Sequence, residues 1–187
     1  MYINWEGPLL TVNPKFGTDL QGNPPKGIKI PTYGHFGGPQ IFGQEGGPVD
    51  SLDTLFASHD GLIAVASNNG QEVPTSQELV EAHAQLIGDI IDLAEGQTTL
   101  DPEATLYTGF TIFALTAQVA QFDDLDGLAL LDDYLDPDDG VPLDDVSAAL
   151  TKAAEYMETG LEAVPNEGKG LNGLFHIWEK QFDALIA

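Results

Sequence analysis

Apolar residues recur at intervals of three and four positions through most of the chain after residue 50, and this spacing is typical of helices that bury one face. Segments with this pattern are predicted to be helical: 50–67, 76–94, 102–121, 125–134, 142–163 and 172–186. The sequence has no firm hairpin signal and no internal repeat. It therefore predicts a mainly α fold.

Local signals mark several helix ends. Asp50 is a suitable N-cap for the first helix, and Thr75 with Glu78 has the spacing of a capping box at the second. Pro102 is placed for the first turn of the third helix. Apolar residues cover nearly all sides of that third helix, so it is predicted to be the central and most buried one.

The chain divides into a core and an acidic extension. Residues 1–121 form the predicted core, and its segment 1–47 is rich in Gly and Pro and is expected to be irregular. Residues 122–187 form an acidic helical extension that is expected to pack on the core. Within it, 136–140 is similar to a calcium-binding loop, but its Gly comes one position early and the closing Glu is missing. We interpret it as an acidic connection, with an extra cation site as the alternative.

Composition excludes several classes of function. The net charge is −24, so nothing offsets repulsion from the phosphates of a nucleic acid. The chain has no cysteine, so its stability comes from packing, with or without a bound metal ion. No apolar run is long enough to span a membrane, and the first residues lack the pattern of a signal peptide.

A histidine and an aspartate are adjacent near the end of the first predicted helix. His59 lies in the apolar stripe of that helix, whereas Asp60 is turned about 100° away, at the edge of the stripe. An imidazole can accept a proton from water, and carboxylates are ligands that calcium prefers. The glycine-rich segment 33–38 can turn backbone carbonyls toward a cation. The pattern is compatible with a general base beside a calcium ion; the alternative is a core histidine beside a solvated acid.

Both segments resemble motifs of the secretory phospholipase A2 family. Tyr33, Gly34 and Gly38 match the family motif Y-G-C-Y-C-G. The motif P-V-D-x-L-D-x-C-C-x-x-H-D is matched, with the family's spacing, by Pro48, Val49, Asp50, Leu52, Asp53, His59 and Asp60.

The resemblance covers residues 33–63 and has clear departures. His35, Gly37, Leu55 and Phe56 stand where the family has cysteine, and a short insertion precedes the second motif. The resemblance is therefore to a divergent, cysteine-free member of the family.

This resemblance implies a fold and an activity. The fold is an antiparallel helix pair with a glycine-rich calcium loop, followed here by a C-terminal helical extension. The activity is calcium-dependent hydrolysis of the sn-2 acyl ester of phospholipids by a water that His59 activates. The implied calcium ligands are the Asp60 carboxylate and the backbone carbonyls of Phe36, Gly38 and Gln40.

The family also uses a second aspartate, on the partner helix, to orient the catalytic histidine. Asp89 is the first candidate for that role, because it lies beside the apolar stripe of helix 76–94, and Asp92 is the second. Helix 102–121 has no acid in its interior after Glu103, so it offers no such group. His83 is expected to be a core or boundary residue. Direct contact between His83 and His59 is a further alternative.

The implied partner is a phospholipid substrate at a membrane interface, which the segment from Lys15 to Lys29 could face. By resemblance the protein is secreted or extracellular, although the lack of a visible signal peptide leaves a cytoplasmic location open. Two other functions remain open. One is a non-catalytic module that binds calcium or a partner on the same scaffold; the other is an acidic helical interaction protein in which the motif is coincidental.

Overall fold

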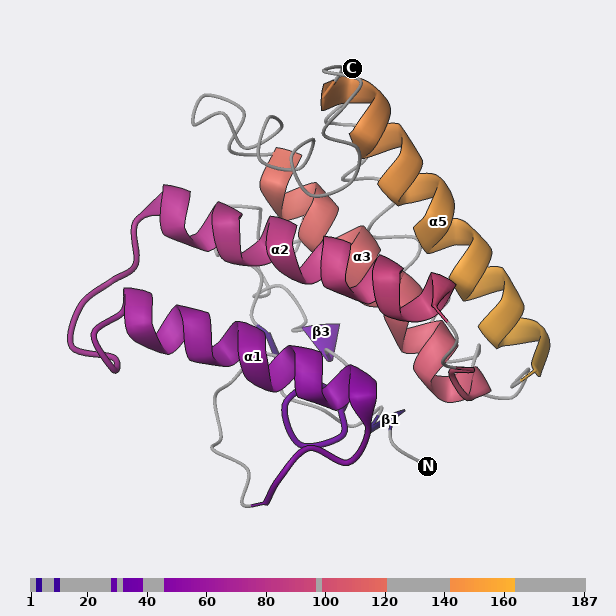
Figure 1. Cartoon of the computed structure of the whole chain (residues 1–187), viewed down its shortest axis with the longest axis horizontal. Coiled ribbons are helices and arrows are strands. Elements are labelled where there is room, and N and C mark those ends of the chain that lie inside the picture. Colours follow the sequence, from indigo (N-terminus) through magenta and orange to yellow (C-terminus); the bar gives the residue numbers. More distant parts are fainter. Residues whose placement is uncertain are drawn as a thin grey trace, which may run out of the picture.

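Helices make up most of the structure, a computed structural model that describes residues 3–4, 9–10, 28–29, 32–38, 46–96, 99–120 and 142–163. The helices are α1 (Ser51–Ala66), α2 (Ser76–Glu95), α3 (Pro102–Ala120) and α5 (Pro142–Ala163) (Figure 1). The prediction of a mainly α fold is confirmed. The further helices predicted at 125–134 and 172–186, and the acidic segment 136–140, lie outside the described residues.

The predicted caps are present at the starts of the helices. The Asp50 carboxylate accepts a hydrogen bond from the backbone N–H of Asp53 at 2.8 Å, which closes the first turn of α1. Thr75 and Glu78 form the predicted capping box at the start of α2. These contacts are local, and for that reason the sequence is sufficient to predict them.

Short strand pairs occur in the N-terminal part, which the sequence predicted to be irregular. β1 (Ile3–Asn4) pairs antiparallel with β4 (Thr32–Tyr33), and β2 (Leu9–Leu10) pairs antiparallel with β3 (Ile28–Lys29). Each strand has two residues, which is too short for an alternating apolar pattern to appear. The prediction that segment 1–47 is irregular was therefore incomplete.

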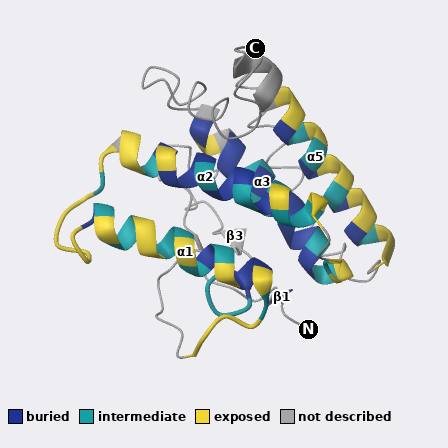
Figure 2. Cartoon of the chain, viewed as in Figure 1, coloured by how far each residue is buried: buried dark blue, intermediate teal, exposed yellow. Residues whose placement is uncertain are grey.

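The helices pack in chain order around α3. α1 and α2 lie side by side and run in opposite directions, α2 packs against α3, and α5 also packs against α3 (Figure 1). Buried positions concentrate on α3 and on the faces of its neighbours that point inward (Figure 2). The prediction that α3 is the central helix agrees with this arrangement.

Three aromatic rings join the N-terminal segment to the helices. Tyr33, Phe56 and Tyr107 are buried, and the centroid of the Tyr107 ring lies 5.2 Å from that of Tyr33 and 5.6 Å from that of Phe56. Aromatic pairs at such separations add stability beyond the area that they bury. The segment before α1 is therefore fixed to both α1 and α3.

Two glycines allow α3 and α5 to approach closely. A Cβ atom on Gly109 would lie 2.6 Å from the carbonyl oxygen of Ala153, and one on Gly160 would lie 2.7 Å from the Cα atom of Leu106. These neighbours are backbone atoms, which cannot swing away as a flexible side chain would. The two helices therefore pack backbone to backbone.

Replacing Gly160 with alanine is expected to destabilise the protein by about 1–3 kcal/mol, because the added methyl group forces the helices apart. Gly61→Ala is the matched control, since nothing lies within 4 Å of a Cβ atom at that helical position. There we expect a gain of about 0.5–1 kcal/mol from the better helix propensity. Urea unfolding measures both, and equal effects at the two positions would contradict the close packing.

Candidate functional site

A buried carboxylate fixes the glycine-rich loop 32–38 to the first turns of α1. The side chain of Asp53 is 0% exposed, and its oxygens accept hydrogen bonds from the backbone N–H groups of His35 at 3.0 and 3.1 Å, Phe36 at 2.8 Å and Val49 at 2.9 Å. Gly34 has a φ of 54°, and a Cβ atom there would lie 2.4 Å from Asp53 Cγ. Glycine at this position therefore lets the loop close over the carboxylate.

The loop itself is a tight turn. The backbone N–H of Tyr33 donates to the carbonyl of Gly37 at 2.7 Å, and the N–H of Gly37 donates to the carbonyl of Tyr33 at 2.8 Å. In a trans peptide the C=O and N–H groups point in opposite directions. Because the Gly37 N–H points toward Tyr33, the carbonyl of Phe36 points away from it. Two other residues were predicted to bind calcium through their carbonyls. Gly38 is the last described residue of the loop, and Gln40 lies outside the described residues.

His59 and Asp60 lie on α1 (Ser51–Ala66), about two helical turns after Asp53, the residue that holds the loop. The distance from His59 Nδ1 to Asp60 Oδ1 is 3.7 Å, and the two side chains are 15% and 16% exposed. Both are thus partly screened from water and still reachable from outside. The structure places the two predicted residues together, as their adjacency in the sequence requires.

The partner of His59 on α2 is His83. Nε2 of His59 lies 3.0 Å from Nδ1 of His83, and the two rings are stacked with centroids 5.2 Å apart. His83 is buried, with 9% of its surface exposed. It belongs to the apolar stripe of α2, and this stripe was the sequence signal that could have placed it opposite His59.

Asp89, the first predicted orienting acid, is bonded elsewhere. It follows His83 by six residues, or about 9 Å along the helix axis. Its side chain forms a hydrogen bond with Gln85 on the same helix, while burial and the nearby Asp92 raise the pKa of its carboxyl group. Asp92 is exposed. The contact shown for His59 on α2 is therefore with an imidazole, which sequence reasoning had held only as a further alternative.

His83 is neutral at neutral pH. Burial in the first place, and the neighbouring His59 in the second, lower the pKa of His83 from 6.5 to about 4. A hydrogen bond with the side chain of Gln118 acts in the opposite direction and raises the pKa. His83 therefore offers His59 a neutral ring and not a negative charge.

This lowered pKa predicts a pH-dependent stability. Between pH 6.5 and about pH 4 the unfolded chain binds a proton at residue 83 and the folded chain does not. The unfolded state thus binds more protons in this window, so the free energy of unfolding falls as the pH is lowered. The contribution of His83 to that fall is about 2 kcal/mol between pH 7.5 and pH 5.

Urea unfolding at the two pH values, for the wild type and for His83→Gln, measures this contribution. The many carboxylates titrate in both proteins, so they cancel in the comparison. Equal pH dependence of the two proteins would contradict a buried, neutral His83.

The metal ligands predicted for this site are all oxygen atoms. Within the described ranges, no three His, Asp or Glu side chains come together as a metal-binding group. The predicted site needs one carboxylate, from Asp60, with backbone carbonyls from the loop. Such a set of hard oxygen donors fits calcium in chemical type.

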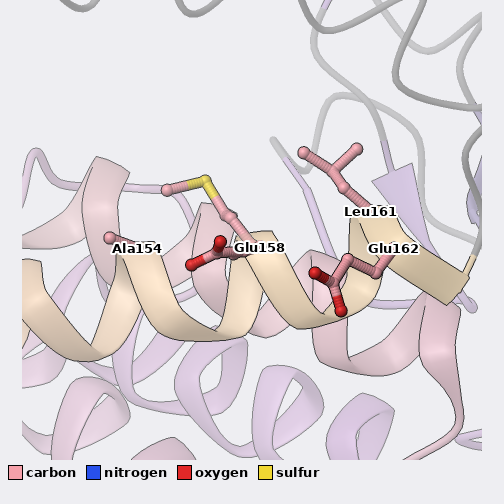
Figure 3. Close-up of a pocket in the computed structure, with 5 residues that line it drawn as sticks. Ala154, Glu158, Leu161 and Glu162 are labelled. Carbon is pink, nitrogen blue, oxygen red and sulfur yellow. The ribbon is translucent and has the colours of Figure 1, made fainter.

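The hollow that the structure shows on α5 is separate from this site. It is lined by Ala154, Met157, Glu158, Leu161 and Glu162 (Figure 3). None of the residues of loop 32–38, α1 or α2 lines it. It therefore adds nothing to the chemistry of His59.

Comparisons with known proteins give no assignment: no protein-family model, curated protein or solved structure matches the chain. In the part of the chain that the structure describes, no helix combines the length and the apolar character needed to cross a bilayer. A functional assignment must therefore be argued from the residues and contacts above.

Proposed function

We propose that this protein is a calcium-dependent, phospholipase A2-like hydrolase that cleaves the sn-2 acyl ester of phospholipids with a water activated by His59. The observation that carries the proposal is the setting of His59. One ring nitrogen, Nδ1, lies beside Asp60, and the other, Nε2, is bonded to a buried residue of the facing helix. A general base requires this combination of a reachable nitrogen and a fixed ring.

Contacts at the cysteine positions of the motif add support. Gly37 and Phe56 both stand at positions where the family has cysteine, and a Cβ atom on Gly37 would lie 2.8 Å from the Phe56 ring. The loop and α1 thus touch at these two positions. An apolar contact joins loop to helix here without any disulfide.

Calcium would be held by Asp60 and by backbone carbonyls of the loop, among them that of Phe36. When bound, it supplies a positive charge that polarises the ester carbonyl and stabilises the oxyanion. Asp53 contributes by holding the loop in one conformation through its three N–H partners. The loop is therefore preorganised before a cation arrives.

His59 would accept the proton of the attacking water at Nδ1 and return it to the leaving alcohol. Asp60 Oδ1 lies 3.7 Å from that nitrogen. His83 replaces the orienting aspartate of the family, and it fixes the ring by hydrogen bonding and stacking. The role proposed for Asp89 on sequence grounds thus passes to His83.

The proposed substrate surface is zwitterionic. The chain carries a net charge of −24, which opposes binding to anionic lipids. Leu62, one helical turn after His59, is 40% exposed and gives this part of the surface an apolar side chain. Of the lysine-containing segment predicted to face lipid, Lys15 and Lys26 lie outside the described residues.

The test is fatty-acid release from zwitterionic phospholipid vesicles, measured in calcium and in chelator. Release that requires calcium supports the proposal. Absence of release from the folded protein under both conditions would overturn it.

A second candidate is a non-catalytic module that binds calcium or a partner on the same scaffold. The observation that favours it is the neutral His83 in the place where the family has a charged acid. Calcium titration of the wild type and of Asp60→Asn decides this alternative, since binding without turnover that weakens in the variant would select it.

A further inference from the structure

We propose that Asn69 is a site of spontaneous deamidation, in which its side-chain amide becomes a carboxylate, and that the hydroxyl group of Ser67 slows the reaction. The site lies in the loop that follows α1 (Ser51–Ala66) and precedes α2 (Ser76–Glu95). The inference goes beyond the proposed hydrolase activity and does not depend on it.

The sequence places the two reacting residue types next to each other. Asn69 is followed directly by Gly70. In deamidation the backbone nitrogen of the following residue attacks the side-chain amide of the asparagine, and glycine leaves that nitrogen least obstructed because it has no Cβ atom. A Cβ atom built on Gly70 would meet nothing within 4 Å, so the surroundings are also open at this point.

The reaction needs only water. The Gly70 nitrogen gives up its proton and forms a bond to Cγ of Asn69, the bond from Cγ to Nδ2 breaks, and the amide nitrogen takes up one proton and leaves as ammonia. The product is a succinimide ring. One water then opens this ring at either carbonyl, which yields aspartate or isoaspartate. No residue is oxidised or reduced, so the reaction requires no cofactor.

The side-chain amide of Asn69 is accessible. The φ angles of Asn69 and Gly70 are 55° and 81°, in the left-handed region that asparagine and glycine adopt most readily. Both residues are exposed. Among the described residues, Asn69 bonds through its backbone N–H, which donates to the carbonyl of Ala64 at 2.7 Å, and its side-chain amide has no partner. That amide can therefore turn toward the nitrogen of Gly70.

The preceding residue, Asn68, is held more firmly. Its side-chain amide donates a hydrogen bond to Oε1 of Glu72 at 3.2 Å. It is followed by Asn69, whose side chain obstructs the backbone nitrogen that would have to attack. Asn68 is therefore expected to react more slowly, and it serves as an internal reference within the same loop.

Ser67 holds the nitrogen that attacks Asn69. The backbone N–H of Gly70 donates to Oγ of Ser67 at 3.0 Å, and this hydroxyl donates to the carbonyl of Ala64 at 3.1 Å. Ser67 is buried, with 9% of its surface exposed. An N–H that is bonded to a fixed hydroxyl does not readily give its proton to water, so the reaction proceeds when the loop opens locally. The folded turn thus slows a reaction that its own sequence favours.

Deamidation changes the connection between α1 and α2. It adds one negative charge to a chain whose net charge is already −24. Isoaspartate also inserts an extra carbon into the main chain, in a turn that is closed by a bond from the Glu72 N–H to the Ser67 carbonyl at 2.9 Å. The modified turn is therefore expected to loosen between the two helices that carry His59 and His83.

Incubation of the purified full chain at neutral and at mildly alkaline pH, followed by peptide mapping with mass spectrometry, measures the conversion of each asparagine. We expect conversion at Asn69 ahead of Asn68, and faster at the higher pH because the attacking nitrogen must lose a proton. Gly70→Ala is expected to suppress it, since the added Cβ atom obstructs that nitrogen. Ser67→Ala is expected to accelerate it by about two- to tenfold, which is the range that the loss of one hydrogen bond gives.

Ser58→Ala is the matched control for the serine substitution. The Ser58 hydroxyl also donates to a carbonyl of the preceding turn, that of Thr54 at 3.1 Å, whereas the N–H of Gly70 is bonded to Ser67. Its removal should leave the rate at Asn69 unchanged. In urea the wild type and Ser67→Ala should react at equal rates, because the unfolded chain lacks the bond to Gly70.

Two results would overturn the inference. If Asn69 stays unconverted in the folded protein while it reacts in urea, the folded chain has no modification site there. If the wild type and Ser67→Ala react equally fast in the folded state, the Ser67 hydroxyl does not control the rate.

Discussion

His59→Gln is expected to lower calcium-dependent fatty-acid release by about 10²–10⁴-fold, because this is the range that a general base contributes. Glutamine has a similar length and can still bond His83, but it cannot take up a proton from water at neutral pH. The rate is measured on zwitterionic vesicles at saturating calcium.

Calcium binding provides the internal control for this variant. The proposed ligands, the Asp60 carboxylate and the loop carbonyls, are unchanged in His59→Gln, so calcium affinity should stay within about twofold of the wild type. A variant that binds calcium normally and still releases fatty acid at the wild-type rate would exclude His59 as the base. Loss of both properties together would indicate a damaged fold and not a missing base.

Asp53→Ala is expected to destabilise the protein by about 3 kcal/mol or more, since each buried N–H left without a partner costs about 1–3 kcal/mol. Three backbone N–H groups, those of His35, Phe36 and Val49, donate to this carboxylate. The loop would lose the contacts that fix it to α1. Urea unfolding measures the loss of stability, and a calcium titration measures the accompanying loss of loop order.

Asp101→Ala is the matched control for this prediction. Asp101 is also an acid at a helix start, but it is exposed and accepts from one N–H, that of Ala104, at 2.9 Å. Removal of such a cap costs about 1 kcal/mol. Equal destabilisation by the two substitutions would mean that Asp53 acts as an ordinary cap and does not hold the loop.

The candidate site was predictable only in part from the sequence. His59 and Asp60 are neighbours on one helix, so the geometry of the helix fixes their relation and the sequence shows it directly. The partner of His59 lies on another helix, and its identity depends on how α1 and α2 are positioned along each other. His83 belongs to the apolar stripe of α2 and Asp89 lies beside that stripe, so the sequence offered both as candidates. The structure places His83 against His59.

The contacts of Asp53 are a second feature that the sequence could not predict. The sequence identified it as part of a matched motif, but its bonds to His35 and Phe36 span 18 and 17 residues, respectively. Such long-range bonds leave no periodic trace in the sequence. The motif singled out Asp53, but only the structure showed that its carboxylate binds the N–H groups of the loop.

The sequence by itself determined the helices and their caps, because apolar spacing and capping act within a few residues. It also determined that His59 and Asp60 share one helix. Only the tertiary structure decided which side chain meets His59, how Asp53 holds the loop, and where Gly109 and Gly160 let α3 and α5 touch. These features depend on the packing of whole helices, in which contacts between residues far apart in the chain are fixed together.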